Sequence, residues 1–193
     1  MTALPKYNKM TVDDFLVWAE TQEGRWELFD GVPVAMSPER VIHGDVKFQV
    51  AQALGAAIAR AGLPCKFVLD SAAVRINKHR SYQPDALVYC GQPLPRDALE
   101  VPSPVVVVEV LSPSNAMKDL RDKLLGYFLV PSIVHYLIVD PDKRLVIHHA
   151  RGSDAIATRI MSDGLFRLDP PGIELTVASL FPPLEEAVPD PAT

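Results

Sequence analysis

The chain has 193 residues, of which 48% are hydrophobic and 22% are charged, so a disordered chain is excluded. This length predicts a single domain over 1–193 that can bury a sizeable core, with the core at about 10–181 and a loose, proline- and acid-rich tail after 181. The net charge of −5 excludes a strong bulk attraction to nucleic acid, so such binding would need a local basic patch or bound cations.

Cysteine usage and hydrophobic runs predict the compartment. The two cysteines, Cys65 and Cys90, lie far apart and outside any CxxC spacing, so we expect neither a structural zinc nor a disulfide. The first ten residues lack the apolar segment of a signal peptide, and no run is long enough to span a membrane. We therefore expect a cytoplasmic protein with no membrane partner.

The N-terminal third predicts a helix, a hairpin and a longer helix. Thr11 and Asp14 have the spacing of a capping box, which starts a short helix. The Asp-Gly pair at 30–31 joins two strand-like runs, which is the strongest short signal for a hairpin. A later apolar stripe of helical spacing is closed by Gly62. We expect these elements at 12–20, 25–36 and 43–61.

The rest of the chain predicts strands with one further helix. Four valines in a row at 105–108, bounded by prolines, are typical of a strand covered on both faces. The expected strands are 66–69, 72–76, 85–90, 105–111 and 133–140, with a polar loop at 77–81, a helix at 118–129 and a trailing antiparallel meander over 145–149, 157–161, 165–168 and 173–175. This pattern predicts an α/β (α+β) fold with a central mixed sheet flanked by helices.

Glu109 is the most informative residue, because it stands inside the valine-rich strand. Burying a carboxylate is costly unless a cation, a metal or a shared proton compensates its charge. If strands 85–90 and 105–111 are neighbours, Asp85 and Glu109 can approach within roughly 5 Å. At that distance they repel by roughly 3 kcal/mol at an effective dielectric of about 20. Two carboxylates with the backbone carbonyl of Val110 would suit Mg²⁺ or Mn²⁺, which could activate water and balance charge on a phosphate.

The helix after the valine strand places Asp119, Lys123 and Tyr127 on one face. A lysine that points back at the two acids could orient water or stabilise a phosphorane-like transition state. Structural alternatives stay open at this point. Asp85 could be a turn residue that bonds its own backbone, and Asp119 with Lys123 could be a solvated ion pair.

Other polar residues can be interpreted as structural or as functional. His43 begins the buried stripe of its helix, where a lone histidine is more often a satisfied core residue than a ligand. Glu27 lies in the hairpin, where a strand glutamate usually faces solvent. A further group consists of basic residues that could contact DNA phosphates or be solvated surface charges. These are Lys78, Arg80, Lys118 and Arg121.

A set of short motifs occurs along the chain in a recognisable order. The motifs are Glu27-Leu28, Asp30-Gly31, Met36-Ser37-Pro38, His43-Gly44, Pro84-Asp85, Glu109 to Ser114, Asp119-x3-Lys123-x3-Tyr127 and Tyr136 to Asp140. Over about 10–181 this order resembles the Uma-type family of restriction-endonuclease-like proteins, within the PD-(D/E)XK nuclease superfamily. The resemblance implies a restriction endonuclease-like core and Mg²⁺- or Mn²⁺-dependent hydrolysis of DNA.

The resemblance also implies roles for single residues. Asp85 and Glu109 match the two acidic, metal-binding positions. Leu111 stands where the superfamily usually has its lysine, and Lys123 matches the lysine that this family carries on the following helix. Glu27 and His43 match recurrent positions with a supporting role, either in the metal shell or as scaffolding of the site. A homodimer in which each protomer cuts one strand is expected.

The alternative is a non-catalytic protein that binds nucleic acid or protein on the same scaffold. A metal-independent hydrolase is disfavoured because the chain has no Gly-x-Ser-x-Gly elbow.

Overall fold

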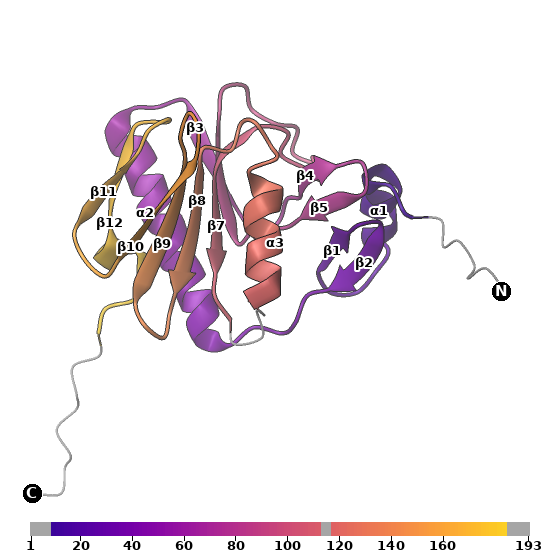
Figure 1. The fold of residues 1–193 in the computed structure, drawn as a ribbon, viewed down its shortest axis with the longest axis horizontal. Coiled ribbons are helices and arrows are strands. Elements are labelled where there is room, and N and C mark those ends of the chain that lie inside the picture. The colour runs from indigo at the N-terminus through magenta and orange to yellow at the C-terminus, as the bar shows by residue number, and fades with distance from the viewer. Residues whose placement is uncertain (1–8, 113–116, 185–193) are drawn as a thin grey trace, which may run out of the picture.

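A six-stranded mixed sheet lies at the centre of the protein, with a helix against each of its faces (Figure 1). The computed structural model describes residues 9–112 and 117–184, with the backbone alone for 117–119. β7 and β8 are parallel, and all other neighbours in this sheet are antiparallel. In spatial order the strands are β10 (Ile156–Met161), β9 (Leu145–Arg151), β8 (His135–Asp140), β7 (Pro104–Val110), β6 (Ala86–Cys90) and β3 (Cys65–Leu69). The predicted central mixed sheet is therefore confirmed.

Helix α2 (Val41–Ala61) covers one face of this sheet. Its apolar stripe packs on the valines of β7 and on the neighbouring strands. The helix ends at Gly62, which has a left-handed conformation with φ of 62° that glycine adopts without steric cost. The same core is closed by a two-stranded sheet and a short 3-10 helix, which are β11 (Leu165–Leu168), β12 (Ile173–Thr176) and η1 (Val177–Leu180).

Helix α3 (Met117–Tyr127) covers the opposite face, which explains the valine run. Val106 and Val108 face the α2 side, whereas Val107 packs with Tyr127 and Tyr136 on the α3 side. Side chains alternate along a strand, so both kinds of position in β7 are buried. The next residue on the α3 side is Glu109, and α3 is therefore positioned to supply its partners.

A second sheet, called the N-terminal sheet because it contains the N-terminal hairpin, lies beside the first (Figure 1). The capping box between Thr11 and Asp14 is present, and the hairpin turns at Asp30 and Gly31, whose φ values are 49° and 83°. Both predictions are confirmed. The elements are α1 (Val12–Ala19), β1 (Trp26–Phe29), β2 (Val32–Ala35), β4 (Val74–Asn77) and β5 (Arg80–Tyr82), with the strands in the order β2-β1-β5-β4.

Two predictions of local structure were wrong. Residues 77–81 are not simply a polar loop, because β5 begins at Arg80 and pairs with both β4 and β1. The trailing strands do not form one meander. β9 and β10 extend the central sheet, whereas β11 and β12 pair only with each other. The apolar residues of these two strands pack in the same core as α2. This packing depends on the tertiary fold, and the alternation of apolar and polar residues along each strand does not reveal it. None of the helices in the described ranges combines the length and apolarity needed to cross a bilayer.

The prediction that the cysteines form no disulfide was also wrong. Cys65 and Cys90 are bonded to each other across the antiparallel pair of β3 and β6, where they stand directly opposite. Twenty-five positions separate them in sequence, so their proximity depends on strand pairing that cysteine spacing does not reveal. The cysteines therefore give no support to the predicted cytoplasmic location, which stays a prediction.

We expect thiol titration of the denatured, unreduced protein to detect no free cysteine, and reduction to release both thiols. The double variant C65S/C90S should lose about 3 kcal/mol of unfolding free energy, because the closed loop no longer restricts the unfolded chain. Urea denaturation of the two proteins measures the difference. Two free thiols in the unreduced protein would contradict the bond.

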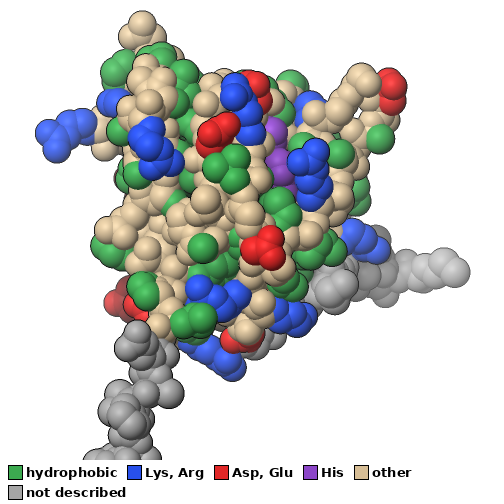
Figure 2. Space-filling view, turned by 90° about the vertical axis from the view of Figure 1, so that its left-hand side faces the viewer, with side chains coloured by type: hydrophobic (Ala, Val, Ile, Leu, Met, Phe, Trp, Pro, Cys, Tyr) green, Lys and Arg blue, Asp and Glu red, His purple; other side chains and the backbone are tan. Residues whose placement is uncertain are grey.

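A buried pair of histidines lies between the central sheet and the β11–β12 sheet. Nδ1 of His135 and Nε2 of His148 are 2.9 Å apart, and both side chains are buried. Burial, the neighbouring His135 ring and Arg159 lower the pKa of His148 to about 4. Since burial also lowers the pKa of His135, both rings of the pair are neutral at pH 7. Figure 2 shows the side of the molecule nearest β10, β11 and β12, where some histidine atoms are visible among Lys and Arg side chains.

Because the folded-state pKa of His148 lies below the ordinary 6.5, its contribution to stability is complete above pH 6.5 and is lost as the pH falls towards 4. Each proton that only the unfolded chain binds adds a slope of about 1.4 kcal/mol per pH unit. The variant H148L should show a flatter dependence of unfolding free energy on pH in this window. Urea titrations at several pH values test this, with the exposed Asp142→Asn as a control. Equal slopes for H148L and wild type would contradict it.

Candidate active site

A cavity of about 240 Å³ opens at the ends of β6 and β7, beside the start of α2 and the β1–β2 hairpin. Its lining combines acidic groups with a histidine and a lysine. The charged and titratable residues that line it are Glu27, Glu39, His43, Asp85, Glu109 and Lys123. Residues from five different parts of the chain therefore meet in one small polar space.

Asp85 immediately precedes β6, whose first residue pairs with the neighbour of Glu109 on β7. Its side chain is 3% exposed, and Oδ2 accepts a hydrogen bond of 2.6 Å from the backbone N–H of Val110. Burial by itself would raise the pKa of Asp85, but contacts with His43, the Lys47 ammonium and Val110 outweigh it and hold the pKa below its ordinary value. Asp85 is thus an ionised carboxylate bonded to the adjacent strand, not a turn residue bonded to its own backbone.

Glu109 lies near the end of β7, and its side chain faces α3. Its Oε1 accepts a hydrogen bond of 2.6 Å from the hydroxyl of Tyr127 and lies 3.1 Å from Nζ of Lys123. Burial raises the pKa of Glu109; the Lys123 ammonium opposes this rise, whereas the carboxylates of Asp85 and Glu27 add to it. Asp85 and Glu109 therefore have opposite tendencies, one towards the ionised form and the other towards the neutral form.

Lys123 and Glu27 are both buried, which excludes the solvated interpretation of each. Nζ of Lys123 lies 3.0 Å from Oε1 of Glu27, and the same oxygen accepts a hydrogen bond of 2.9 Å from the N–H of Gln83. Lys123 thus bridges β1 and β7 from α3. This ammonium group is one of the contacts that tie the hairpin of the N-terminal sheet to the central sheet.

Lys47 was missed by the sequence analysis and is the partner of Asp85. Its side chain is 3% exposed, and Nζ lies 2.8 Å from Oδ1 of Asp85, 2.6 Å from Glu39 and 2.8 Å from Asp70. Arg25 also contacts Glu39 and Asp70, at 2.8 Å each. The available signal was a charged residue beside Val46 on the buried stripe, four positions after His43. Nothing local in the sequence indicated Glu39, Asp70 or Arg25.

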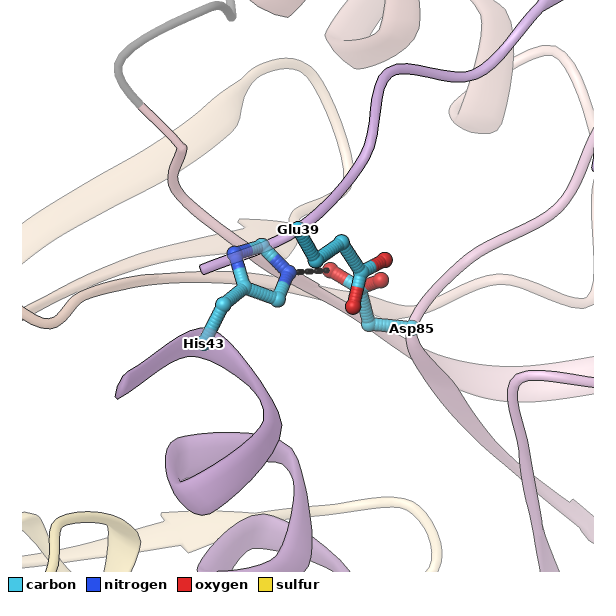
Figure 3. A group of neighbouring side chains, drawn as sticks. All are labelled: Glu39, His43 and Asp85. Carbon is cyan, nitrogen blue, oxygen red and sulfur yellow. Dashed lines mark ion pairs between the residues drawn. The ribbon is translucent and has the colours of Figure 1, made fainter. Parts of the chain in front are cut away.

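His43 projects from the first turn of α2 towards Asp85 and Glu39 (Figure 3). Its Nε2 lies 3.4 Å from Oδ2 of Asp85. The side chain is buried, yet neither ring nitrogen has a hydrogen-bond partner in the described structure. His43 is therefore not the satisfied core histidine of the structural interpretation.

The remaining predicted residues are less tightly assembled. Val110 lines the cavity, and Tyr127 reaches it through Glu109. Lys78 is exposed at the β4–β5 turn, and Arg80 pairs with Asp30. Arg121 is exposed on α3, next to Asp122. The side chains of Lys118 and Asp119 lie outside the described residues.

The donors present fit a divalent cation. The compact group of ligand atoms in the described residues is Glu39, His43 and Asp85, whose ligand atoms all lie within 4.8 Å of one another. This differs from the predicted set of Asp85, Glu109 and Val110. Carboxylate oxygens suit Mg²⁺ and Mn²⁺, and an imidazole nitrogen favours Mn²⁺ of the two. A buried imidazole nitrogen that makes no hydrogen bond and faces two carboxylates suits a metal ligand.

Comparison with known proteins identifies the family of the chain and supports its fold. The model of the Uma2 family, described as "Putative restriction endonuclease", matches residues 12–178, and the chain belongs to this family. An uncharacterized protein from Synechocystis, slr1290, is 28% identical over 137 residues, which is 69% of this chain and 70% of that protein. A crystal structure from Anabaena variabilis, titled a putative nuclease belonging to DUF820, has a TM-score of 0.71. It covers 89% of this chain and 97% of its own at 17% identity, and so supports the fold.

We expect the substitution Glu109→Gln to stabilise the protein when metal is removed, and to lower its stability relative to the wild type when metal is added. Because the folded-state pKa of Glu109 is raised, its contribution to stability is complete below the ordinary 4.5 and is lost as the pH rises through the folded-state pKa. Glutamine keeps an acceptor for Tyr127 and cannot ionise. With a chelator at about pH 8, E109Q should therefore be more stable than wild type by the order of 1 kcal/mol.

Added Mn²⁺ should stabilise the wild type by about 2.7 kcal/mol at a hundredfold excess over its Kd, and E109Q by much less. Urea denaturation with EDTA and with MnCl₂ measures both effects, and D142N is the control. If Mn²⁺ stabilises E109Q as much as it stabilises the wild type, Glu109 is not a metal ligand.

Proposed function

We propose that this protein is an Mg²⁺- or Mn²⁺-dependent endonuclease that hydrolyses DNA phosphodiester bonds. The observation that supports it most is the meeting of Asp85, Glu109 and Lys123 in one cavity at the ends of adjoining strands. Membership of the Uma2 family supports a nuclease-like function independently of this geometry.

In this proposal Asp85 and Glu109, with the backbone carbonyl of Val110, hold the cation. A bound divalent ion supplies a water of lowered pKa and balances negative charge on the phosphate. Lys123 is already oriented towards Glu109 and Glu27, and its ammonium can donate to the attacking water or to the phosphate oxygen on which charge develops. Tyr127 and Glu27 fix the position of Glu109 and Lys123.

The substrate contacts are part of the same proposal. Lys78, Arg80, Lys118 and Arg121 are proposed to contact DNA phosphates, and a homodimer would let each protomer cut one strand. Since the chain is acidic overall, binding should depend on these few cations and weaken with salt.

A plasmid-nicking assay with MnCl₂ or MgCl₂ tests this proposal. We expect the wild type to convert supercoiled DNA to nicked and linear forms. D85N, E109Q and K123M should each lower the rate by roughly a hundredfold or more, because each removes a group that acts on the transition state. The surface variant D142N should cleave at the wild-type rate.

Cleavage by the three site variants at the wild-type rate would point to a contaminating nuclease and defeat the proposal. DNA binding with no cleavage under either metal would favour the non-catalytic alternative. That alternative has some structural support, because Asp85 and Glu109 each contact a lysine ammonium group of the protein itself.

A further inference from the structure

The contacts of Lys47 coincide with those that a cation at this site would use. Its ammonium group lies 2.6 Å from Oε1 of Glu39 and 2.8 Å from Oδ1 of Asp85. These two residues, with His43, are the ones whose ligand atoms cluster within 4.8 Å (Figure 3). An ion bound in this cluster would therefore have the same two carboxylates as partners as the Lys47 ammonium group.

Charge and burial favour a further cation in this cluster, besides Lys47 and Arg25. Glu39, Asp70 and Asp85 are three carboxylates that share the two cations Lys47 and Arg25, which leaves one negative charge uncompensated. His43 is 5% exposed, and both its ring nitrogens lack a hydrogen-bond partner. Its Nε2 lies 3.4 Å from Oδ2 of Asp85 without a hydrogen bond, and such a buried nitrogen is costly unless it gains a proton or a metal ion.

We infer that Glu39, His43 and Asp85 form a divalent-cation site, and that Lys47 competes with the ion for Glu39 and Asp85. The inference shares Asp85 with the proposed function and adds ligands that the function itself does not require. Lys47 is a positioning residue in this scheme. It keeps Asp85 ionised and in place until an ion binds.

Asp70 makes such an exchange feasible. Both of its carboxylate oxygens already contact Nζ of Lys47, at 2.8 and 3.0 Å. An ion that takes over Glu39 and Asp85 leaves the ammonium with Asp70, so that no buried charge loses all its partners. Two cations this close repel each other, and the charge on Lys47 therefore weakens ion binding.

Isothermal titration with MnCl₂ tests the competition. Lys47→Met removes the charge and retains most of the side chain, so Mn²⁺ should bind roughly tenfold or more tightly than to the wild type. Glu39→Gln removes a ligand and should weaken binding by roughly tenfold or more. Lys66→Met and Glu174→Gln change the same residue types on exposed strand positions and should leave the Kd unchanged.

K47M leaves three carboxylates with one cation, so its folding is checked by circular dichroism with and without MnCl₂. If it folds only with MnCl₂, its melting temperature should rise more steeply with Mn²⁺ concentration than that of the wild type. Pulsed EPR of bound Mn²⁺ supplies a further readout, since ¹⁴N coupling from His43 should be present in the wild type and absent in His43→Gln.

Unchanged Mn²⁺ affinity in both E39Q and K47M would overturn the inference, as would weaker binding to a folded K47M. These outcomes are separate from those of the nicking assay. If D85N and E109Q abolish cleavage while E39Q and K47M bind Mn²⁺ as the wild type does, the nuclease proposal stands and the Glu39 site fails. If affinities change as expected but no DNA is cut, the cation site stands and the nuclease proposal fails.

Discussion

The pairing of Asp85 with Lys47 and of Glu109 with Lys123 is the interaction on which this site depends. The two acids lie at the ends of adjoining strands in a largely apolar part of the sheet, where an uncompensated carboxylate would be expensive. Lys47 reaches Asp85 from α2 on one face, and Lys123 reaches Glu109 from α3 on the other. The two helices that cover the sheet thus also supply the lysines that compensate the charges of these two acids.

The N-terminal sheet completes this arrangement and does more than lie beside the core. Glu27 on β1 holds Lys123, and Glu39, in the segment after β2, holds Lys47. Each lysine is therefore shared between a site acid and an acid from the hairpin region. This sharing weakens the hold of each lysine on its site acid, which is a useful property where a metal ion must bind to the same oxygens.

The sequence predicted those parts of the site that lie inside strong local patterns. Glu109 was conspicuous because a charge next to four valines has few structural explanations. Helical spacing placed Lys123 on one face with Asp119 and Tyr127, but its role in the site came from the family resemblance, since spacing alone also fitted a solvated ion pair. The sheet register that sets Asp85 beside Glu109 was expected only on condition that the strands are neighbours. Lys47 belongs to α2, and its partners at 39, 70 and 85 come from three separate segments, so no local pattern joins them. The Cys65–Cys90 bond was missed for the same reason, because pairing of β3 with β6 is a tertiary fact.

The charges of the whole cluster bear on why a doubly charged ion is suited to this cavity. Five carboxylates, at positions 27, 39, 70, 85 and 109, are contacted by three permanent cations, Arg25, Lys47 and Lys123. If all five were ionised, two negative charges would remain, which equals the charge of one divalent ion. Without that ion, the raised pKa of Glu109 lets this one residue take up a proton and reduce the excess. Proton and metal would then be alternative ways to neutralise the same cluster of acids, so metal affinity should increase as the pH rises through the pKa of Glu109.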